Sequence, residues 1–516
     1  MVKISIFAGI AAAVAGLASA APVENVCKNT GPILNWQLFN VCEHVCNRYT
    51  VKTVAEIQQI VRNAAAAGRG VKALGAHHTY TDNACKLDAD IIEMIAMNNV
   101  VEINKEEGYI WVESGATFAK INAALALKGM GIFMAQPAAP TITIGGALAN
   151  SAHGSAWTSN SGVPQNTLAI EFVNATGHVE TLTEDDKERF AAMRTNLGLL
   201  GIVTKVKYAA HDASLITFGF DTASEKDAIA EGFLPTLNSN DAMLAWYFPP
   251  LKRYLTLKMN RLSQRGDIGT PNAPAKASAD QVQSTMRNTF AGMLEHAIRC
   301  AVPIGRPADC DDNNSKNNAT MPASSVALDT DVASGMSAFD SFKDKIGDLI
   351  PKMKFSLPVG LGDDELCVPL KRHQEAMALV RDVFAQYHDF EIGFKGLSAA
   401  FPLVQFRFAK PDDVTYLALN SASSPADKDL WSEGAVWMEI WFAVTAADEN
   451  RTGKLRLALE QGLMALGARP HWAKNREITL EGAAKRYGNA EAFSKIRREM
   501  DPTDMFYNDF ARRAGL

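Results

Sequence analysis

The spacing of apolar residues predicts a β-rich first half of the chain that opens with one helix. Residues 51–67 carry apolar side chains at helical spacing behind Thr53, whose hydroxyl can cap a helix start. Short apolar and β-branched runs, bounded by turn-forming residues, then predict strands. These strands are expected at residues 71–74, 90–94, 100–103, 109–112, 168–173, 179–182 and 197–208, with a second helix at 117–128.

The second half alternates strands with longer helical stretches, which predicts a different architecture. Strands are expected at residues 242–247, 254–259, 366–370, 403–409 and 436–444. Helices are expected at residues 279–297, 342–350, 372–387, 453–467 and 490–500. The whole pattern predicts an α+β fold, in which a β-rich domain is followed by an antiparallel sheet covered by helices.

Changes in this pattern mark the expected domain boundaries. A chain of 516 residues is too long for one core, so more than one domain is expected. We expect a signal peptide (1–20), a Cys-tethered extension (21–48), a β-rich domain (49–212), a cap domain (213–465) and a C-terminal segment (466–516) that returns to the β-rich domain.

Charge and hydropathy exclude several kinds of partner. The formal net charge is −6 and no long basic run occurs, so nucleic acid and an anionic membrane are not expected. Lys3 precedes a short apolar stretch, residues 4–17, and Ala18-Ser19-Ala20 resembles a signal-peptide cleavage site. That stretch is too short to span a bilayer comfortably, so we expect secretion rather than the alternative of a membrane anchor.

Secretion changes the interpretation of the seven cysteines, because an oxidising compartment favours disulfide pairing. Since their number is odd, at least one cysteine stays unpaired. Cys300 and Cys310 bracket a short loop and are expected to pair. Cys367 lies in a strand-like run and is expected to be the free thiol. Four cysteines tie the extension to the next domain with open connectivity; these are Cys27, Cys42, Cys46 and Cys85. The sequence contains no Cys-x-x-Cys, and no metal site is predicted.

Four Asn-x-Ser/Thr sequons fit surface glycosylation of a secreted protein. They are Asn174, Asn313, Asn318 and Asn450.

Two glycine-punctuated segments follow apolar, β-prone runs. Backbone N–H groups can approach a pyrophosphate only where no side chain blocks them, so glycine and alanine suit such a lining. The first segment, residues 74–82, contains Gly75, Ala76, His77, His78 and Thr79. The second, residues 140–155, contains Thr141, Thr143, Gly145, Gly146, His153, Gly154 and Ser155. The chain has no convincing Gly-x-Gly-x-x-Gly between a strand and a helix, so this is not a Rossmann arrangement.

In their order these segments resemble the FAD-binding half of the vanillyl-alcohol-oxidase (VAO/PCMH) type flavoproteins. Three C-terminal strings narrow the resemblance: VQFRF at 404–408, RPHWAK at 469–474 and DPTDMFYN at 501–508. Together they resemble the aldonolactone oxidases (gulonolactone and arabinonolactone oxidases) and the related alditol oxidases. The resemblance covers about residues 50–212 and 360–510, and it implies FAD as the cofactor of the β-rich domain.

The resemblance implies that His78 attaches the flavin covalently through a ring nitrogen. A neutral imidazole is a nucleophile near neutral pH, so this chemistry is plausible. The alternatives are that His78 only hydrogen-bonds the cofactor, or that neighbouring His77 shifts the register. The resemblance also implies that the other residues named in the two segments bind the cofactor, while His153 has the alternative of a structural histidine.

The same resemblance points to Lys474 and Arg407 as substrate contacts, since a cation stabilises developing negative charge on a hydroxyl or on the reduced ring. One residue departs from the family pattern: relatives usually carry Glu where this chain has Gln405. An amide can orient a hydroxyl but cannot accept its proton. Glu439 restores a carboxylate if its side chain faces the flavin, and is a solvent-facing strand residue otherwise.

We therefore expect a secreted FAD-dependent oxidase that takes hydride from the CH–OH carbon of a sugar lactone, polyol or related alcohol to flavin N5, with O₂ reduced to H₂O₂. An alternative is an FAD-linked enzyme for a phenolic or polyketide alcohol. That alternative rests on the Gln405 departure and on four aromatic residues, which are Trp246, Tyr247, Trp437 and Trp441. A further alternative is a secreted flavin-binding protein without turnover.

Overall fold

The computed structural model describes residues 27–28, 30–36, 40–133, 139–262, 325–328, 360–387, 399–444, 449–474 and 481–516, together with four single positions between 281 and 292. Several expected features lie outside these residues. They are the signal peptide (1–20), the Cys300–Cys310 bond, the sequons at Asn313 and Asn318, the helix at 342–350 and all but four positions of the helix at 279–297.

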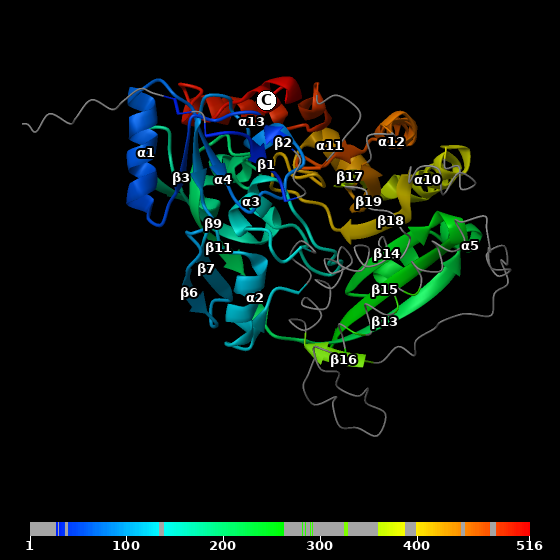
Figure 1. The fold of residues 1–516 in the computed structure, drawn as a ribbon. Helices are drawn as coiled ribbons and strands as arrows, with labels where there is room; N and C mark the ends of the chain where they lie inside the picture. Colours follow the sequence, from blue (N-terminus) through cyan, green and yellow to red (C-terminus); the bar gives the residue numbers. More distant parts are fainter. Residues whose placement is uncertain are drawn as a thin grey trace, which may run out of the picture.

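A three-stranded parallel sheet opens the fold, in the order β3 (Asn47–Thr50), β5 (Asp90–Glu93) and β4 (Val71–Leu74). Helix α1 (Val54–Ala66) connects β3 to β4 and stands at the blue edge of the molecule (Figure 1). Its start is a capping box: Thr53 accepts a hydrogen bond from the Glu56 amide, and the Glu56 carboxylate accepts one from the Thr53 amide. The local sequence thus fixes this helix, as predicted.

A five-stranded antiparallel sheet follows, in the order β10-β9-β11-β7-β6. Its strands are β6 (Val100–Asn104), β7 (Tyr109–Glu113), β9 (Thr167–Val173), β10 (Val179–Leu182) and β11 (Ile202–Ala209). Helices α2 (Phe118–Ala126), α3 (Ile144–Ala149) and α4 (Lys187–Met193) accompany it. Ile110, Ile170 and Val206 of this sheet share one buried cluster with Phe118 and Ile144 of α2 and α3. Two short strands, β8 (Met130–Gly131) and β12 (His211–Asp212), pair antiparallel beside it.

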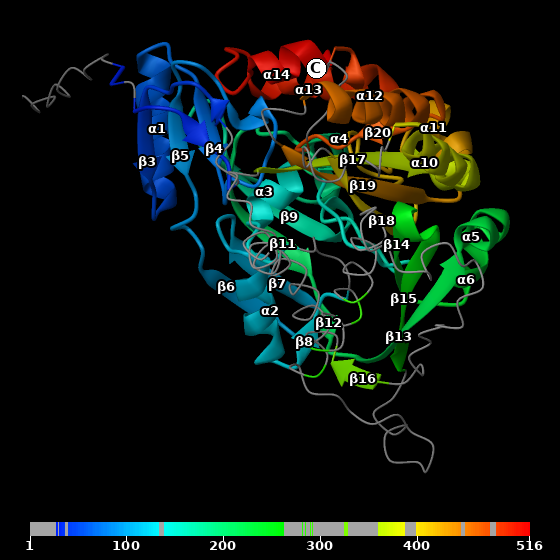
Figure 2. The same ribbon diagram turned by 45° about the vertical axis from the view of Figure 1, so that its right-hand side comes forward.

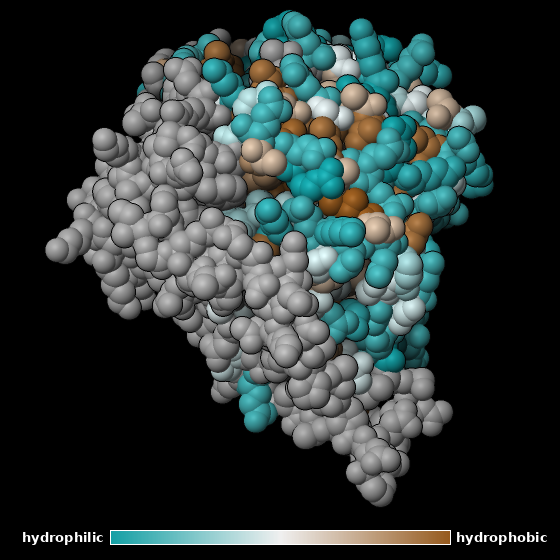
Figure 3. All heavy atoms as spheres, turned by 90° about the vertical axis from the view of Figure 1, so that its right-hand side faces the viewer, coloured by the Kyte–Doolittle hydropathy of each residue, from teal (hydrophilic) through white to brown (hydrophobic). Residues whose placement is uncertain are grey.

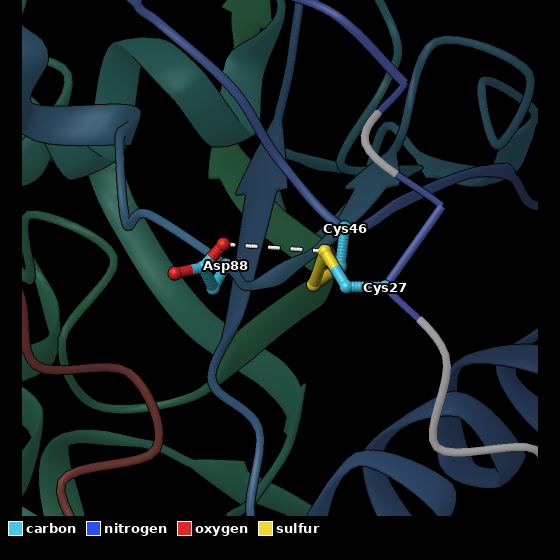
Figure 4. Close-up of side chains that lie close together, drawn as sticks. All are labelled: Cys27, Cys46 and Asp88. Atoms are coloured by element: carbon cyan, nitrogen blue, oxygen red, sulfur yellow. Dashed lines mark hydrogen bonds between the residues drawn. A yellow bond between two sulfur atoms is a disulfide. The ribbon is translucent and has the colours of Figure 1, made fainter.

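The N-terminal extension is held by two disulfides whose pairing the sequence left open. Cys27 bonds to Cys46, and Cys42 bonds to Cys85, while Cys367 is a buried free thiol, as predicted. The extension contains the strand pair β1 (Ile33–Leu34) and β2 (Asn40–Cys42). Asp88 lies beside Cys27 (Figure 4). Because both sulfurs are consumed in the disulfide, this group offers no thiolate to a metal.

An eight-stranded antiparallel sheet forms most of the second half, in the order β16-β13-β15-β14-β18-β19-β17-β20. Its strands are β13 (Leu215–Ser224), β14 (Ala242–Phe248), β15 (Arg253–Leu262), β16 (Ser325–Leu328), β17 (Gly360–Pro369), β18 (Ala399–Ala409), β19 (Ala435–Val444) and β20 (Arg469–Pro470). The antiparallel sheet confirms the α+β prediction. Strand β17 begins six residues before the expected start at 366, because its acidic residues, which are typical of a loop, are paired inside the structure.

The two faces of this sheet differ in chemistry, as strand alternation requires. One face is apolar, with Val404, Phe406 and Met438 among its residues, and shares a buried cluster with the helices beside it. Those helices are α5 (Glu225–Glu231), α6 (Leu234–Asn238), α10 (His373–Tyr387) and α12 (Glu449–Ala465). Their outer surface is mostly hydrophilic where it is coloured (Figure 3). The opposite face is polar and is described with the site.

The C-terminal helices lie beside the N-terminal strands in both ribbon views (Figures 1 and 2). Phe493 of α13 (Ala490–Met500) and Phe510 of α14 (Asp509–Ala514) belong to the same buried cluster as the five-stranded sheet. The Asn508 side chain donates hydrogen bonds to the carbonyls of Asn83 (2.8 Å) and Cys85 (2.7 Å). The expected domain boundaries stay predictions. Helix α11 (Pro425–Trp431) completes the described elements.

Within the described residues, every helix is too short or too polar to cross a lipid bilayer.

Candidate active site

A cavity lies between the two glycine-punctuated segments and the polar face of β17, β18 and β19. From the first half of the chain its lining includes Gly75, Ala76, His77, His78, Thr79, Thr143, Gly145, Gly146 and His153. From the second half it includes Asp363, Glu365, Gln405, Arg407, Glu439, Trp441, His471 and Lys474. The fold therefore brings together segments that are some 400 residues apart.

Two glycines allow the first-half segments to approach one another closely. A Cβ at Gly75 would stand 2.3 Å from the Thr143 hydroxyl oxygen, and one at Gly145 would stand 2.8 Å from the Ser114 Cβ. The Gly145 amide donates to the Ser114 carbonyl at 2.9 Å. Ser114 also lines the cavity, and its buried hydroxyl has no hydrogen-bond partner among the described residues. An unpaired buried hydroxyl fits a site that holds a polar cofactor such as FAD.

The two neighbouring histidines have different partners. The His77 backbone has a left-handed φ of 59°, and its Nδ1 lies 3.0 Å from the Leu34 carbonyl of the extension. The His78 Nε2 lies 3.0 Å from the Thr141 hydroxyl. Burial, with the nearby charge of Lys474, lowers the pKa of His78 to about 4, so its imidazole is neutral at physiological pH.

Strand register sets the polar face of the eight-stranded sheet. Glu439 of β19 stands directly opposite Gln405 of β18 on one side and Glu365 of β17 on the other. Arg407 lies two residues after Gln405 on β18, and Asp363 lies two residues before Glu365 on β17. Because side chains alternate along a strand, both project from the same face as Gln405 and Glu365. These five side chains form one patch that faces the glycine-punctuated segments.

Lys474 joins this patch, so that two cations and three carboxylates are bonded together. Arg407 donates to Glu365 at 2.9 Å and to Glu439 at 3.0 Å. Lys474 donates to Glu439 at 2.8 Å and also pairs with Asp363. Arg407 and the three carboxylates are buried and Lys474 is mostly buried, so each charge depends on its partners for compensation.

The shared cations act unequally on the carboxylates. Burial would raise the pKa of Glu439, but Lys474 and Arg407 lower it to about 2. Burial likewise opposes ionisation of Glu365, yet Arg407 holds its pKa well below the usual value. Burial and the charge of Glu439 raise the pKa of Asp363 well above the usual value. Asp363 is therefore the carboxylate of this patch best suited to exchange a proton.

His153, His471 and Glu365 lie close enough to one another to suggest a metal site, but their hydrogen bonds argue against it. The His471 Nδ1 accepts a hydrogen bond from the Ala473 amide at 3.1 Å, which leaves the proton on Nε2, the nitrogen nearer Glu365. Arg407 already donates to Glu365. The Trp437 ring stacks on His153 at 3.8 Å between centroids. His153 is thus held as a packed, hydrogen-bonded part of the cavity wall.

The structure does not place every predicted site residue at the cavity. Thr141 reaches it only through His78. Gly154 and Ser155 lie away from the lining, and Ser155 is fully buried. The Ser155 hydroxyl donates to the Met243 carbonyl of β14 and accepts from the Phe408 amide of β18 at 3.0 Å. It therefore joins two strands of the large sheet.

Sequence reasoning missed Asp363, Glu365, His471 and the cavity residues Trp36 and Tyr80. Of the four aromatic residues noted in the sequence, Trp441 lines the cavity. Tyr247 belongs to the apolar cluster on the opposite face of the sheet. The run of three acidic residues at 363–365, which leads directly into an apolar strand, was the available signal for the first two.

Two family models match the chain on either side of its middle. The model described as "FAD binding domain" matches residues 48–183, and the model described as "D-arabinono-1,4-lactone oxidase" matches residues 337–514. The two matches correspond to the two halves that line the cavity.

Curated relatives match along most of their length. The chain is 23% identical to the L-gulono-1,4-lactone dehydrogenase of Mycobacterium tuberculosis, covering 89% of this chain and 93% of that protein. It is 24% identical to a probable L-gulonolactone oxidase of Arabidopsis thaliana (95% and 83% covered). It is 22% identical to a putative D-arabinono-1,4-lactone oxidase of Neurospora crassa (90% and 82% covered).

Solved structures share the fold. A solvent-stable cholesterol oxidase aligns with a TM-score of 0.66 at 16% identity, covering 94% of this chain and 97% of that one. A chitooligosaccharide oxidase aligns with a TM-score of 0.60 at 13% identity, covering 93% of each chain.

Proposed function

We propose that the protein is an FAD-dependent oxidoreductase of the VAO/PCMH type that oxidises the CH–OH group of a sugar lactone, polyol or related alcohol with O₂ as electron acceptor; the two family-model matches, the lactone-oxidising relatives and the shared fold support this. One observation carries the proposal: Lys474 and Arg407 converge with Asp363 and Glu439 on the cavity wall that faces His78. This patch can orient an alcohol, polarise it and take its proton.

The first-half lining suits the cofactor. FAD, when bound, would supply the acceptor for a hydride, which carries the two electrons of the oxidation. Residues 75–79 and 143–146 would hold it. The Ser114 hydroxyl, which has no hydrogen-bond partner among the described residues, would donate a hydrogen bond to it. Gly75 and Gly145 both line the cavity, and neither position has room for a Cβ beside its neighbouring segment.

Each polar residue of the large sheet has a separate task. The charges of Lys474 and Arg407 favour an alkoxide-like substrate oxygen. Asp363, which faces the cavity and contacts Lys474, accepts the hydroxyl proton. Glu439 fixes both cations in place, and this offsets the missing carboxylate at Gln405. The Gln405 amide, buried directly opposite Glu439, orients a substrate oxygen without exchanging a proton.

His78 is the attachment point for the flavin in this proposal. Its neutral imidazole, its position at the cavity and its hydrogen bond with the Thr141 hydroxyl support that role. Secretion is proposed from the amino-terminal residues, and the two disulfides agree with an oxidising compartment. Glycosylation at Asn174 and Asn450 belongs to the same proposal.

An apolar part of the cavity favours a second substrate class. Trp36, Tyr80 and Trp441 line the cavity together with the polar patch. Aromatic surfaces bind the apolar face of a sugar ring, but they also suit a phenolic or polyketide alcohol. Hydrogen peroxide release should therefore be measured with aldonolactones, alditols and aromatic alcohols at equal concentrations.

The test begins with the purified protein before and after acid precipitation. We expect yellow colour to stay with the pellet, and His78→Ala to release it into the supernatant while His77→Ala does not. If the acid pellet of His78→Ala stays yellow, the flavin is attached covalently to a residue other than His78. Peroxide formed with none of the three alcohol classes, from a protein that holds FAD, favours a flavin-binding protein without turnover.

A further inference from the structure

The N-terminal extension forms a cover over the loop that carries His77 and His78. We define the cover as the described residues 30–36 and 40–46. Its side chains Ile33, Val41 and Val45 share a small buried cluster with Leu74, which immediately precedes the loop, and with Ile91. The cover is therefore packed onto the first sheet beside the loop rather than attached by sequence continuity alone.

Backbone and side-chain hydrogen bonds join the cover to the loop residue by residue. The Trp36 amide donates to the His77 carbonyl at 2.9 Å. The Asn35 side chain donates to the Thr79 carbonyl at 3.2 Å. The His77 Nδ1 lies 3.0 Å from the Leu34 carbonyl. Three successive residues of the cover thus bind the positions immediately around His78.

The cover also contacts the His78 ring itself. The Trp36 ring stacks on the His78 imidazole, with centroids 5.3 Å apart and planes 27° apart. The same ring packs edge to face against the Tyr80 ring, with centroids 6.4 Å apart. Thr141 lies 3.0 Å from the His78 Nε2. One aromatic face and one hydroxyl thus restrict the rotation of the imidazole, whose burial keeps it neutral.

A disulfide holds the cover on the loop. Cys85, seven residues after His78, bonds to Cys42 of β2. The second disulfide, Cys27–Cys46, lies beside Asp88 and links two positions of the extension to each other (Figure 4). The chain therefore contains one disulfide that joins the cover to the His78 segment and one that does not.

We propose that this cover, held by Cys42–Cys85, positions the His78 imidazole for covalent attachment of FAD, with Trp36 as the positioning residue, so that attachment follows disulfide formation. The inference rests on the proposed role of His78. In the attachment, a ring nitrogen of His78 bonds to the C8α carbon of the flavin. The nitrogen and C8α each lose one hydrogen, and the two protons and two electrons released pass to O₂, giving H₂O₂.

Substitutions at Trp36 test the positioning role directly. Trp36→Phe keeps a ring face, whereas Trp36→Leu keeps only apolar volume. Leu34→Ala is the matched control, because the exposed Leu34 side chain lies two residues before Trp36 in the cover and its backbone carbonyl stays in place. The readout is the rate at which colour becomes acid-stable after FAD is added to each apoprotein.

We expect Trp36→Leu to slow attachment about three- to tenfold, the size of one lost aromatic contact, while Trp36→Phe and Leu34→Ala stay within about twofold of the wild type. The FAD not yet attached should remain bound and appear in the acid supernatant. Equal attachment rates for Trp36→Leu and the wild type would overturn the inference and leave the role of His78 intact.

The disulfide dependence is tested with paired serine variants. Cys42→Ser/Cys85→Ser should lower the attachment rate more than Cys27→Ser/Cys46→Ser. Equal rates for the two variants contradict the dependence. If Cys42→Ser/Cys85→Ser does not fold, the Trp36 series still decides the positioning role. Covalent flavin in His78→Ala would instead refute the underlying function, so the two failures remain distinguishable.

Discussion

Asp363 and Glu439 share the same lysine, yet their surroundings drive their protonation in opposite directions. Glu439 touches both Lys474 and Arg407, and these cations lower its pKa to about 2 against the effect of burial. Asp363 touches only Lys474 of this pair, and burial together with the charge of Glu439 raises its pKa. Carboxylates whose pKa values are pushed apart in this way commonly divide acid, base and electrostatic tasks.

Replacing Asp363 with Asn should remove the acid limb of the pH profile. Activity that requires the ionised carboxylate rises with pH through the pKa of Asp363, which lies well above 3.8. We expect kcat/KM of Asp363→Asn at its plateau to fall about 10²- to 10⁴-fold and to lose this rise. Steady-state kinetics between pH 4 and 9 measures both effects.

Asp364→Asn is the matched control for this experiment. Asp364 is the next residue on the same strand, but its carboxylate pairs with Arg456 of α12 on the opposite face of the sheet. The control should lose stability and keep the shape of the wild-type pH profile. A wild-type profile in Asp363→Asn would assign proton acceptance to another group.

At the scale of elements, the site depends on how closely α3 approaches β7. Gly145 and Gly146 are neighbours in α3, but they meet different surroundings. A Cβ at Gly145 would collide with Ser114 at 2.8 Å, whereas one at Gly146 would lie 3.1 Å from the Thr143 hydroxyl oxygen, a contact that a small shift relieves. The first glycine is needed for packing, and the second faces the cavity.

Alanine at these two positions should therefore separate folding from cofactor binding. We expect Gly145→Ala to destabilise the apoprotein by about 1–3 kcal/mol, as overpacking does. Gly146→Ala should leave apoprotein stability unchanged or slightly raised, since alanine favours helix, and should weaken FAD binding at least about tenfold. Denaturant unfolding and FAD titration measure the two effects. Unchanged FAD affinity in Gly146→Ala would place the cofactor elsewhere.

At the scale of the whole molecule, Lys72 joins three distant segments. Lys72 is a residue of β4. Its Nζ donates hydrogen bonds to the carbonyls of Leu197 (3.4 Å), Gly198 (2.9 Å) and Phe506 (3.3 Å). Its side chain is almost fully buried, and this burial lowers its pKa from 10.5 to about 7. The contact links the first sheet to the loop between α4 and β11 and to the C-terminal segment.

The stability supplied by Lys72 should depend on pH. Between pH 7 and 10.5 the unfolded chain binds a proton at Lys72 that the folded protein does not, so folding becomes more favourable as pH rises through this window. The stability difference between wild type and Lys72→Met should grow with pH by roughly 1 kcal/mol per unit. Unfolding midpoints at pH 7, 8 and 9 measure it, with the exposed Lys128→Met as control. A pH-independent difference would mean that Lys72 stays charged in the folded protein.

Much of the local structure was available from the sequence. Thr53 and Glu56 determine the start of α1 through bonds between residues three apart. The glycines of the two segments, the period-two runs and the RPHWAK string were likewise readable, because each depends on neighbours along the chain. The periodicity was enough to predict the α+β class, and the family resemblance carried by the motifs implied the FAD-binding half and pointed to His78, Arg407 and Lys474, which line the cavity.

Only the tertiary structure decided which polar residues meet. Glu439 faces the cavity because register sets it opposite Gln405 and Glu365, which lie on strands far from it in sequence. Asp363 is strand rather than loop because Lys474, 111 residues away, pairs with it. Cys42 meets Cys85 rather than Cys46 because the cover packs on Leu74. Cross-strand register and long-range pairing depend on burial of the assembled chain, and no local pattern contains them.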